Sequence, residues 1–144
     1  MFMKRLIIGL LFASLCSLAS ADIGQIKKLS GKVHILRGGQ QVNAVAGDGV
    51  RQQDTIVTGV DGSVGITFID NSRFSTGPNS QLELSRFRFD TTTHEGEFTA
   101  DLKQGTLSVV SGQLAKHSPQ QMKVRTPSSL LAVRGTSFLI KVGE

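Results

Sequence analysis

The chain of 144 residues contains one cysteine, no tryptophan and no tyrosine. A single cysteine forms no intramolecular disulfide and builds no cysteine metal site. The aromatic residues are eight phenylalanines, so the chain lacks the Trp and Tyr rings that commonly stack on nucleic-acid bases. These absences argue against a function based on thiol chemistry and against nucleic-acid binding.

The first 21 residues have the three parts of an export signal. Lys4 and Arg5 form a positive segment, Leu6–Leu18 is an apolar run, and Ala19 and Ala21 provide a small-x-small cleavage site. The apolar run is too short for a convincing membrane span. We therefore predict a cleaved signal peptide over residues 1–21 and a mature domain over residues 22–144.

The signal also determines the predicted compartment. Cys16 lies inside the apolar run and follows Leu15, whereas a lipoprotein signal needs a small residue there, so we predict no lipid anchor. Cleavage removes Cys16 together with Lys4 and Arg5, and the formal net charge falls from +5 to +3. The other basic residues are scattered, which is a weak basis for nucleic-acid binding. We predict a periplasmic protein without a nucleic-acid partner and without a transmembrane segment in the mature chain.

Apolar and polar residues alternate with a period of two in several short segments, as in strands with one buried face. Turn residues such as Asp61-Gly62-Ser63 separate the segments. No segment after the signal carries a sustained helical stripe with a cap at each end, and residues 116–121, interrupted by Pro119, are predicted to be a surface loop. We predict a single small all-β domain of short strands, a solenoid-like roll or a sandwich. The predicted core residues are Val33, Ile35, Val64, Ile66, Phe68, Leu82, Leu84, Phe98, Ala100, Leu102, Met122 and Val124.

The apolar parity changes once within a predicted strand. Leu82 and Leu84 share one parity, whereas Phe87 and Phe89 have the other. A strand changes its buried face only at a bulge or a bend. We therefore predict a bulge near Ser85 or Arg86.

No catalytic or metal-binding constellation is visible in the sequence. There is no Gly-x-Ser-x-Gly elbow, the histidines are isolated from one another, and the acidic residues lack the spacing of a calcium loop. Aspartate is common in turns because it bonds the neighbouring backbone. We predict no enzymatic activity, no catalytic residue, no metal site and no cofactor. The histidines and turn aspartates to which this prediction assigns no metal or catalytic role are His34, His94, His117, Asp48, Asp54, Asp61 and Asp70.

The most informative segment is an apolar run near the C-terminus, interrupted by Thr126-Pro127 and by the corner Arg134-Gly135-Thr136. In a regular strand, Arg134 shares the inward parity of Ala132, Phe138 and Ile140. A buried guanidinium must be paired or hydrogen-bonded. It either ties turns together, through Asp54, Asp61 or Asp70, or anchors an anionic ligand.

The ordered set of short motifs resembles the FecR domain, the periplasmic module of bacterial transmembrane signalling regulators. The resemblance implies an all-β periplasmic domain. In family members with the full architecture, this domain sits between an outer-membrane siderophore receptor and an inner-membrane anti-sigma segment, and relays ligand occupancy to transcription. No such segment is visible in this sequence, so we expect a stand-alone exported member of the family. The motifs are Gly31-Lys32-Val33, Gly47-Asp48, Asp54-Thr55, Thr58-Gly59, Asp61-Gly62, Asp70-Asn71-Ser72, Pro78-Asn79-Ser80, Gly105-Thr106-Leu107, and the closing positions Thr126, Pro127, Arg134, Gly135, Thr136 and Phe138.

We therefore predict a non-catalytic binding or relay module that binds a protein partner in envelope signalling or assembly. The alternative is a module that binds carbohydrate or peptidoglycan, against which the lack of Trp and Tyr argues, because sugar sites usually offer flat aromatic faces. The compartment, the absence of catalytic motifs and the resemblance all enter this prediction.

The last strand offers a candidate partner surface. Its residues are apolar and β-prone, and few residues follow that could pair with it. An open strand edge invites another strand, because its unpaired N–H and C=O groups template pairing. We predict strand addition by a protein partner, or self-association, at this edge; the alternative is an interior strand paired on both sides. The edge consists of Phe138, Leu139, Ile140, Lys141 and Val142.

Overall fold

The computed structural model describes residues 21–133 and 137–143. These residues form a predominantly β fold, which confirms the all-β prediction. The strands are β1 (Gly24–Ser30), β2 (Val33–Arg37), β3 (Gln40–Asn43), β4 (Gly49–Val50), β5 (Thr55–Thr58), β6 (Ser63–Phe68), β7 (Arg73–Thr76), β8 (Gln81–Phe89), β9 (Gly96–Val110), β10 (Met122–Arg125), β11 (Leu130–Ala132) and β12 (Ser137–Val142); the helices are α1 (Gln113–His117) and the 3-10 helix η1 (Pro119–Gln121).

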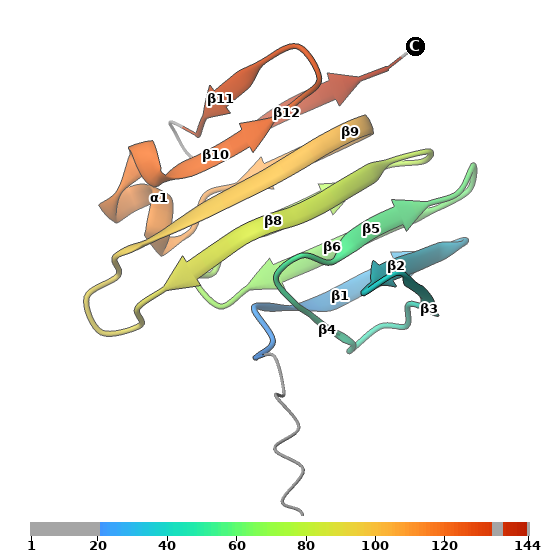
Figure 1. The fold of residues 1–144 in the computed structure, drawn as a ribbon, viewed down its shortest axis with the longest axis horizontal. Helices are drawn as coiled ribbons and strands as arrows, with labels where there is room; N and C mark the ends of the chain where they lie inside the picture. The colour runs from blue at the N-terminus through green and yellow to red at the C-terminus, as the bar shows by residue number, and fades with distance from the viewer. Residues whose placement is uncertain (1–20, 134–136, 144) are drawn as a thin grey trace, which may run out of the picture.

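The long strand β9 organises the fold because its two halves belong to different layers. Up to Gln104 it pairs with β8 on one side and, in parallel, with β10 on the other. From Gly105 onward it pairs with β7 and β12. The sheet, in the order β3-β2-β5-β8-β9-β7-β6-β1-β4, therefore curls through β9 into a half-barrel (Figure 1).

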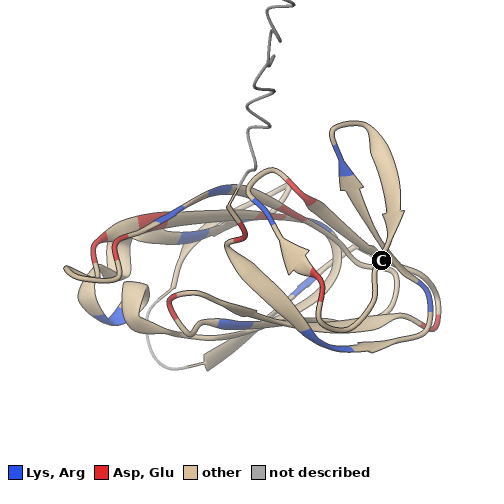
Figure 2. Cartoon of the chain, turned by 90° about the horizontal axis from the view of Figure 1, so that it is seen from below, with Lys and Arg blue, Asp and Glu red and all other residues tan. Residues whose placement is uncertain are grey.

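We name the two layers for reference. Layer A contains β1, β4, β6, β7, the second half of β9, and β12. Layer B contains β2, β3, β5, β8, the first half of β9, β10 and β11. Figure 2 shows the curled sheet from below, with the basic and acidic positions coloured.

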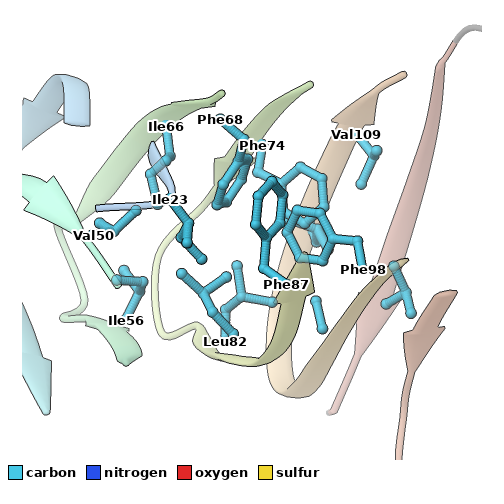
Figure 3. Close-up of a cluster of buried hydrophobic side chains, with 14 of the residues drawn as sticks. Ile23, Val50, Ile56, Ile66, Phe68, Phe74, Leu82, Phe87, Phe98 and Val109 are labelled. Atoms are coloured by element: carbon cyan, nitrogen blue, oxygen red, sulfur yellow. The ribbon is translucent and has the colours of Figure 1, made fainter. Parts of the chain in front are cut away.

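The core lies between the layers and centres on four phenylalanines (Figure 3). Phe68 and Phe74 come from layer A, and Phe87 and Phe98 come from layer B. Neighbouring ring centroids are 4.8–5.8 Å apart, in edge-to-face and stacked pairs. All twelve predicted core residues are buried, so the period-two alternation identified the inward faces of β2, β6, β8, β9 and β10 correctly.

The predicted bulge in β8 is confirmed. The register between β8 and β9 shifts between Leu84 and Arg86. Leu84 is buried before the shift and Phe87 after it, while Arg86 between them is exposed. The extra residue lets both apolar sets reach the same core.

Residues 116–121 lie on the surface as predicted, but the prediction of a loop was wrong, because helical turns occupy most of this segment. Helix α1 buries Leu114 against the core, and the N–H of Gln113 donates to the carbonyl of Asp70 at 2.7 Å. Pro119 starts η1, where its missing N–H has no helical partner to lose. A five-residue helix is too short to produce the periodic stripe by which a helix is recognised in sequence.

Candidate functional site

The Thr126-Pro127 motif forms the turn that reverses the chain between β10 and β11. The N–H of Thr126 donates to the carbonyl of Ser129 at 2.8 Å, and the N–H of Ser129 donates back at 3.4 Å. Pro127 occupies the second position of this four-residue turn, where its fixed φ is favourable. The turn lays β11 antiparallel to β10, with Arg125 opposite Leu130.

Strand β12 lies at an edge of the described fold. It runs antiparallel to the second half of β9, from Ser137 opposite Val110 to Val142 opposite Gly105. Among residues 21–133 and 137–143, no strand pairs with its other side. The residues of the predicted partner edge thus belong to an edge strand, and their use by a partner stays a prediction.

Successive residues of β12 direct their backbone N–H and C=O groups alternately toward β9 and toward the open side. One hydrogen bond of β9 shows which residues face which side. The carbonyl of Thr106 in β9 accepts the N–H of Gly77 at 3.2 Å, so it points toward β7 and away from β12. In antiparallel strands the N–H and C=O of one residue point to the same side, and successive residues alternate. Lys141 lies opposite Thr106, so Lys141, and by the same parity Leu139, directs its N–H and C=O to the open side.

The side chains of the two edge strands leave three leucines exposed. Ile140 is buried at 8% relative exposure, and Phe138 and Val142 pack partly against the core, whereas Leu139 is 69% exposed. On β11, Leu130 is 60% and Leu131 is 39% exposed. Both strands lie at the top of Figure 1. Apolar side chains of this size therefore sit on two strands with free edges.

The sequence did not reveal Leu130 and Leu131 as exposed residues. Their segment is apolar at four consecutive positions, so it contains no alternation that would distinguish an inward face. The predicted inward parity of Ala132 was wrong: Ala132 is exposed and Val133 is buried. The N–H of Val133 donates to the carbonyl of Met122 at 2.9 Å, which fixes this orientation.

The charges next to β11 are compensated by an ion pair on the outer face of layer B. Asp101 of β9 accepts Nε of Arg125 at 2.7 Å and a second guanidinium nitrogen at 2.9 Å. The hydrogen bond to Asp101 raises the pKa of Arg125 above its ordinary value. Ser85 also donates to this carboxylate. Because the two charges neutralise each other, the exposed side chains of Leu130 and Leu131 form the apolar part of the surface around β11.

The remaining predicted positions are only partly within the described structure. Arg134, Gly135, Thr136 and Ala19 lie outside the described residues, and Ala21 is exposed just before β1.

The three aspartates considered as partners of Arg134 make other contacts. Asp54 binds the Arg37 guanidinium at 2.9 and 2.8 Å, Asp61 accepts the N–H of Lys32, and Asp70 accepts the N–H and hydroxyl of Ser72.

The bidentate pair of Arg37 and Asp54 joins β2 to the turn before β5. The carboxylate of Asp54 is almost fully buried and also accepts the N–H of Arg51 at 2.8 Å. Its hydrogen bond with Arg37 raises the pKa of that guanidinium above its ordinary value. A buried charge held by these donors is a structural element of the fold.

The part of the chain that the structure describes contains no group of three or more His, Cys, Asp or Glu residues arranged to hold a metal ion. Within the same residues, no helix has the length and apolar character needed to cross a membrane.

Comparison with known proteins gives one family match. Residues 54–144, more than half of the chain, match the family described as FecR protein. The match begins at Asp54, so β1 to β4 precede it, and the motifs from Asp54-Thr55 to Phe138 lie within it. No curated protein and no solved structure shows a significant match to the chain.

Proposed function

The chain belongs to the FecR protein family, a family of signalling-related modules of the cell envelope, and from this premise we propose that it is an exported, non-catalytic module that binds a protein partner at the free edge of β12. Residues 1–21 direct export, and the mature chain acts in the periplasm. The bound partner contributes an extended segment that continues layer A as an additional strand.

The outward backbone groups of β12 carry the proposal. Leu139 and Lys141 direct N–H and C=O groups to the open side, where an added strand can bond them. Natural sheets protect such edges with charge, proline or bulges, and here Lys141 is the one charged residue of the strand. Leu139, exposed between the outward backbone groups, offers an apolar side chain to the incoming segment.

A photo-crosslinking amino acid placed at residue 139 is expected to capture a protein partner in cells that export the chain. The matched control places the same probe at residue 60, because Val60 is also apolar and is 81% exposed, but lies in the turn between β5 and β6. Mass spectrometry of the adducts distinguishes a second copy of the chain from a different protein. Equal capture from both positions, or none from residue 139, would contradict the proposed site.

Replacing Leu139 with proline is expected to weaken association about tenfold, because the substitution removes one outward donor of the main chain. Leu139→Ala serves as the control, since it shortens the same side chain and keeps the N–H. Association is measured by sedimentation velocity for self-association, or by titration of the captured partner.

Circular dichroism and thermal unfolding complete this test. Leu139→Pro should stay folded, whereas Ile140→Pro should destabilise the fold, because the Ile140 N–H faces β9 and its side chain is buried. Equal effects of Leu139→Pro and Leu139→Ala on association would show that only the side chain contacts the partner. Unfolding of Leu139→Pro would show that its N–H bonds β9.

A further inference from the structure

The strands of layer A contain no acidic residue. Neither Asp nor Glu occurs in β1, β4, β6, β7, the second half of β9 or β12. Layer B differs, because Glu83, Glu97 and Asp101 lie in its strands. Each of these three carboxylates is paired with a basic side chain on the same layer, Lys103, Arg86 and Arg125 respectively, at 2.7–3.5 Å.

Four basic side chains of layer A are exposed without such a partner. Lys27 and Lys28 lie at the register shift of β1, Arg73 starts β7, and Lys141 lies in β12. No ion pair joins any of them to a carboxylate in the described part of the chain. Lys27 donates to the side-chain oxygen of Gln25 at 2.9 Å, which is a neutral acceptor. The positive charge of this face is therefore available to an external anion.

These basic residues share a face with short polar side chains. In one cross-strand row, Gly65 lies opposite both Lys28 and Ser75, and Ser75 lies opposite Ser108. A Cβ added to Gly65 would lie 3.8 Å from Cβ of Lys28 and 3.9 Å from Oγ of Ser75, so the three positions point to the same side. The next outward row continues from Gln25 through Thr67, Arg73 and Val110 to Ser137.

The result is a face on which hydroxyl groups lie between cations. A shallow groove on it is lined by Lys27, Lys28, Ser30, Ser63, Gly65, Ser75 and Thr76, with Leu29, Ala46 and Val64 as its apolar part. From β1 to β12 the face crosses five strands, which at ~4.8 Å between neighbours spans about 19 Å. An extended chain can therefore contact the cations of β1, β7 and β12 at once.

We propose that the outer face of layer A binds an extended anionic polysaccharide. The cations attract its carboxylate or sulfate groups, and the hydroxyls between them bond the sugar hydroxyls. A neutral sugar would need an aromatic platform, which this face lacks. Among the described outward side chains, the main apolar ones are Leu139, Val110 and, just after β6, Ile69, too few for insertion into a lipid surface or for the desolvated centre of a protein interface.

The test compares two triple variants with equal loss of charge. Lys27→Gln, Lys28→Gln and Arg73→Gln together remove three of the four exposed cations of layer A, and Arg86→Gln, Lys103→Gln and Lys123→Gln remove three cations of layer B. Binding of fluorescent dextran sulfate and polygalacturonate is measured by anisotropy at low and at high salt, with neutral dextran as the reference. The layer A variant is expected to bind about tenfold more weakly than the unmodified chain, and the layer B variant less than about twofold more weakly. Binding should weaken at high salt.

Three outcomes would overturn the proposal: equal losses for both variants, equal binding of neutral dextran, or no polysaccharide binding together with binding to vesicles that contain phosphatidylglycerol. The last outcome would assign the face to an anionic membrane surface. No substituted residue lies in β11 or β12. Lys141 belongs to both surfaces but is unchanged in these variants, so the test of the polysaccharide face does not depend on the test of the β12 edge.

Discussion

Replacing Phe68 with alanine is expected to lower the free energy of unfolding by about 3–5 kcal/mol, the range for truncating a buried aromatic side chain. Phe68 is 2% exposed, and its ring contacts Phe74, Phe87 and Phe98 at centroid distances of 4.9, 5.8 and 4.8 Å. The substitution leaves a cavity between the two layers, and the paired strands around it limit how far the site can collapse. Urea denaturation followed by circular dichroism measures the loss.

Phe89→Ala is the matched control for this experiment. Phe89 lies at the end of β8, is only partly buried, and stacks on His94 with centroids 5.9 Å apart. Its removal should cost about 1 kcal/mol, a common value for single substitutions. A loss below about 1 kcal/mol for Phe68→Ala, or equal losses for the two variants, would contradict a core centred on Phe68.

Much of the fold could be predicted from the sequence because strands of this domain have one buried and one solvated face. The period of side chains along a strand is two, so Val64, Ile66 and Phe68 reveal their common direction without knowledge of the partner strands. The bulge in β8 followed from the same rule, since only an extra residue reconciles Leu84 with Phe87.

The passage of β9 from layer B to layer A also shows in the sequence as a change in the parity of its apolar residues. The buried residues Phe98 and Leu102 have even residue numbers, whereas the buried residues Leu107 and Val109 have odd ones. The parity therefore changes near Gly105, where β9 leaves layer B. The absence of acidic residues from layer A becomes meaningful only after this crossing assigns each strand to a layer.

Other features depend on contacts between segments that are distant in sequence. Arg37 and Asp54 form their pair because β2 lies beside β5, and no local pattern selects one aspartate among several. The exposure of Leu130 and Leu131 depends on the position of β11 outside β10. For the candidate site, the sequence predicted the edge residues 138–142, while the direction of their N–H groups required the bond between Gly77 and Thr106.

Gly105→Ala is expected to lower the free energy of unfolding by at least about 3 kcal/mol. Gly105 has a φ of +95°, a conformation in which a residue with a side chain costs about 1–3 kcal/mol. An added Cβ would also overlap the Cα, Cβ and Oγ atoms of Ser80. Ser80 cannot easily move, because it is buried, accepts the N–H of Thr106 at 3.0 Å and donates its own N–H to Thr58 at 2.8 Å.

Gly47→Ala separates the two causes of this loss. Gly47 has a similar φ of +97°, but an added Cβ there meets no atom within 4 Å. Its substitution should cost only the backbone strain, about 1–2 kcal/mol, so the difference between the two variants measures the close approach of β9 to Ser80. Equal losses in urea denaturation would mean that Ser80 moves aside without cost. Because β9 joins the two layers at Gly105, a larger loss for Gly105→Ala would establish that this contact stabilises the curled sheet.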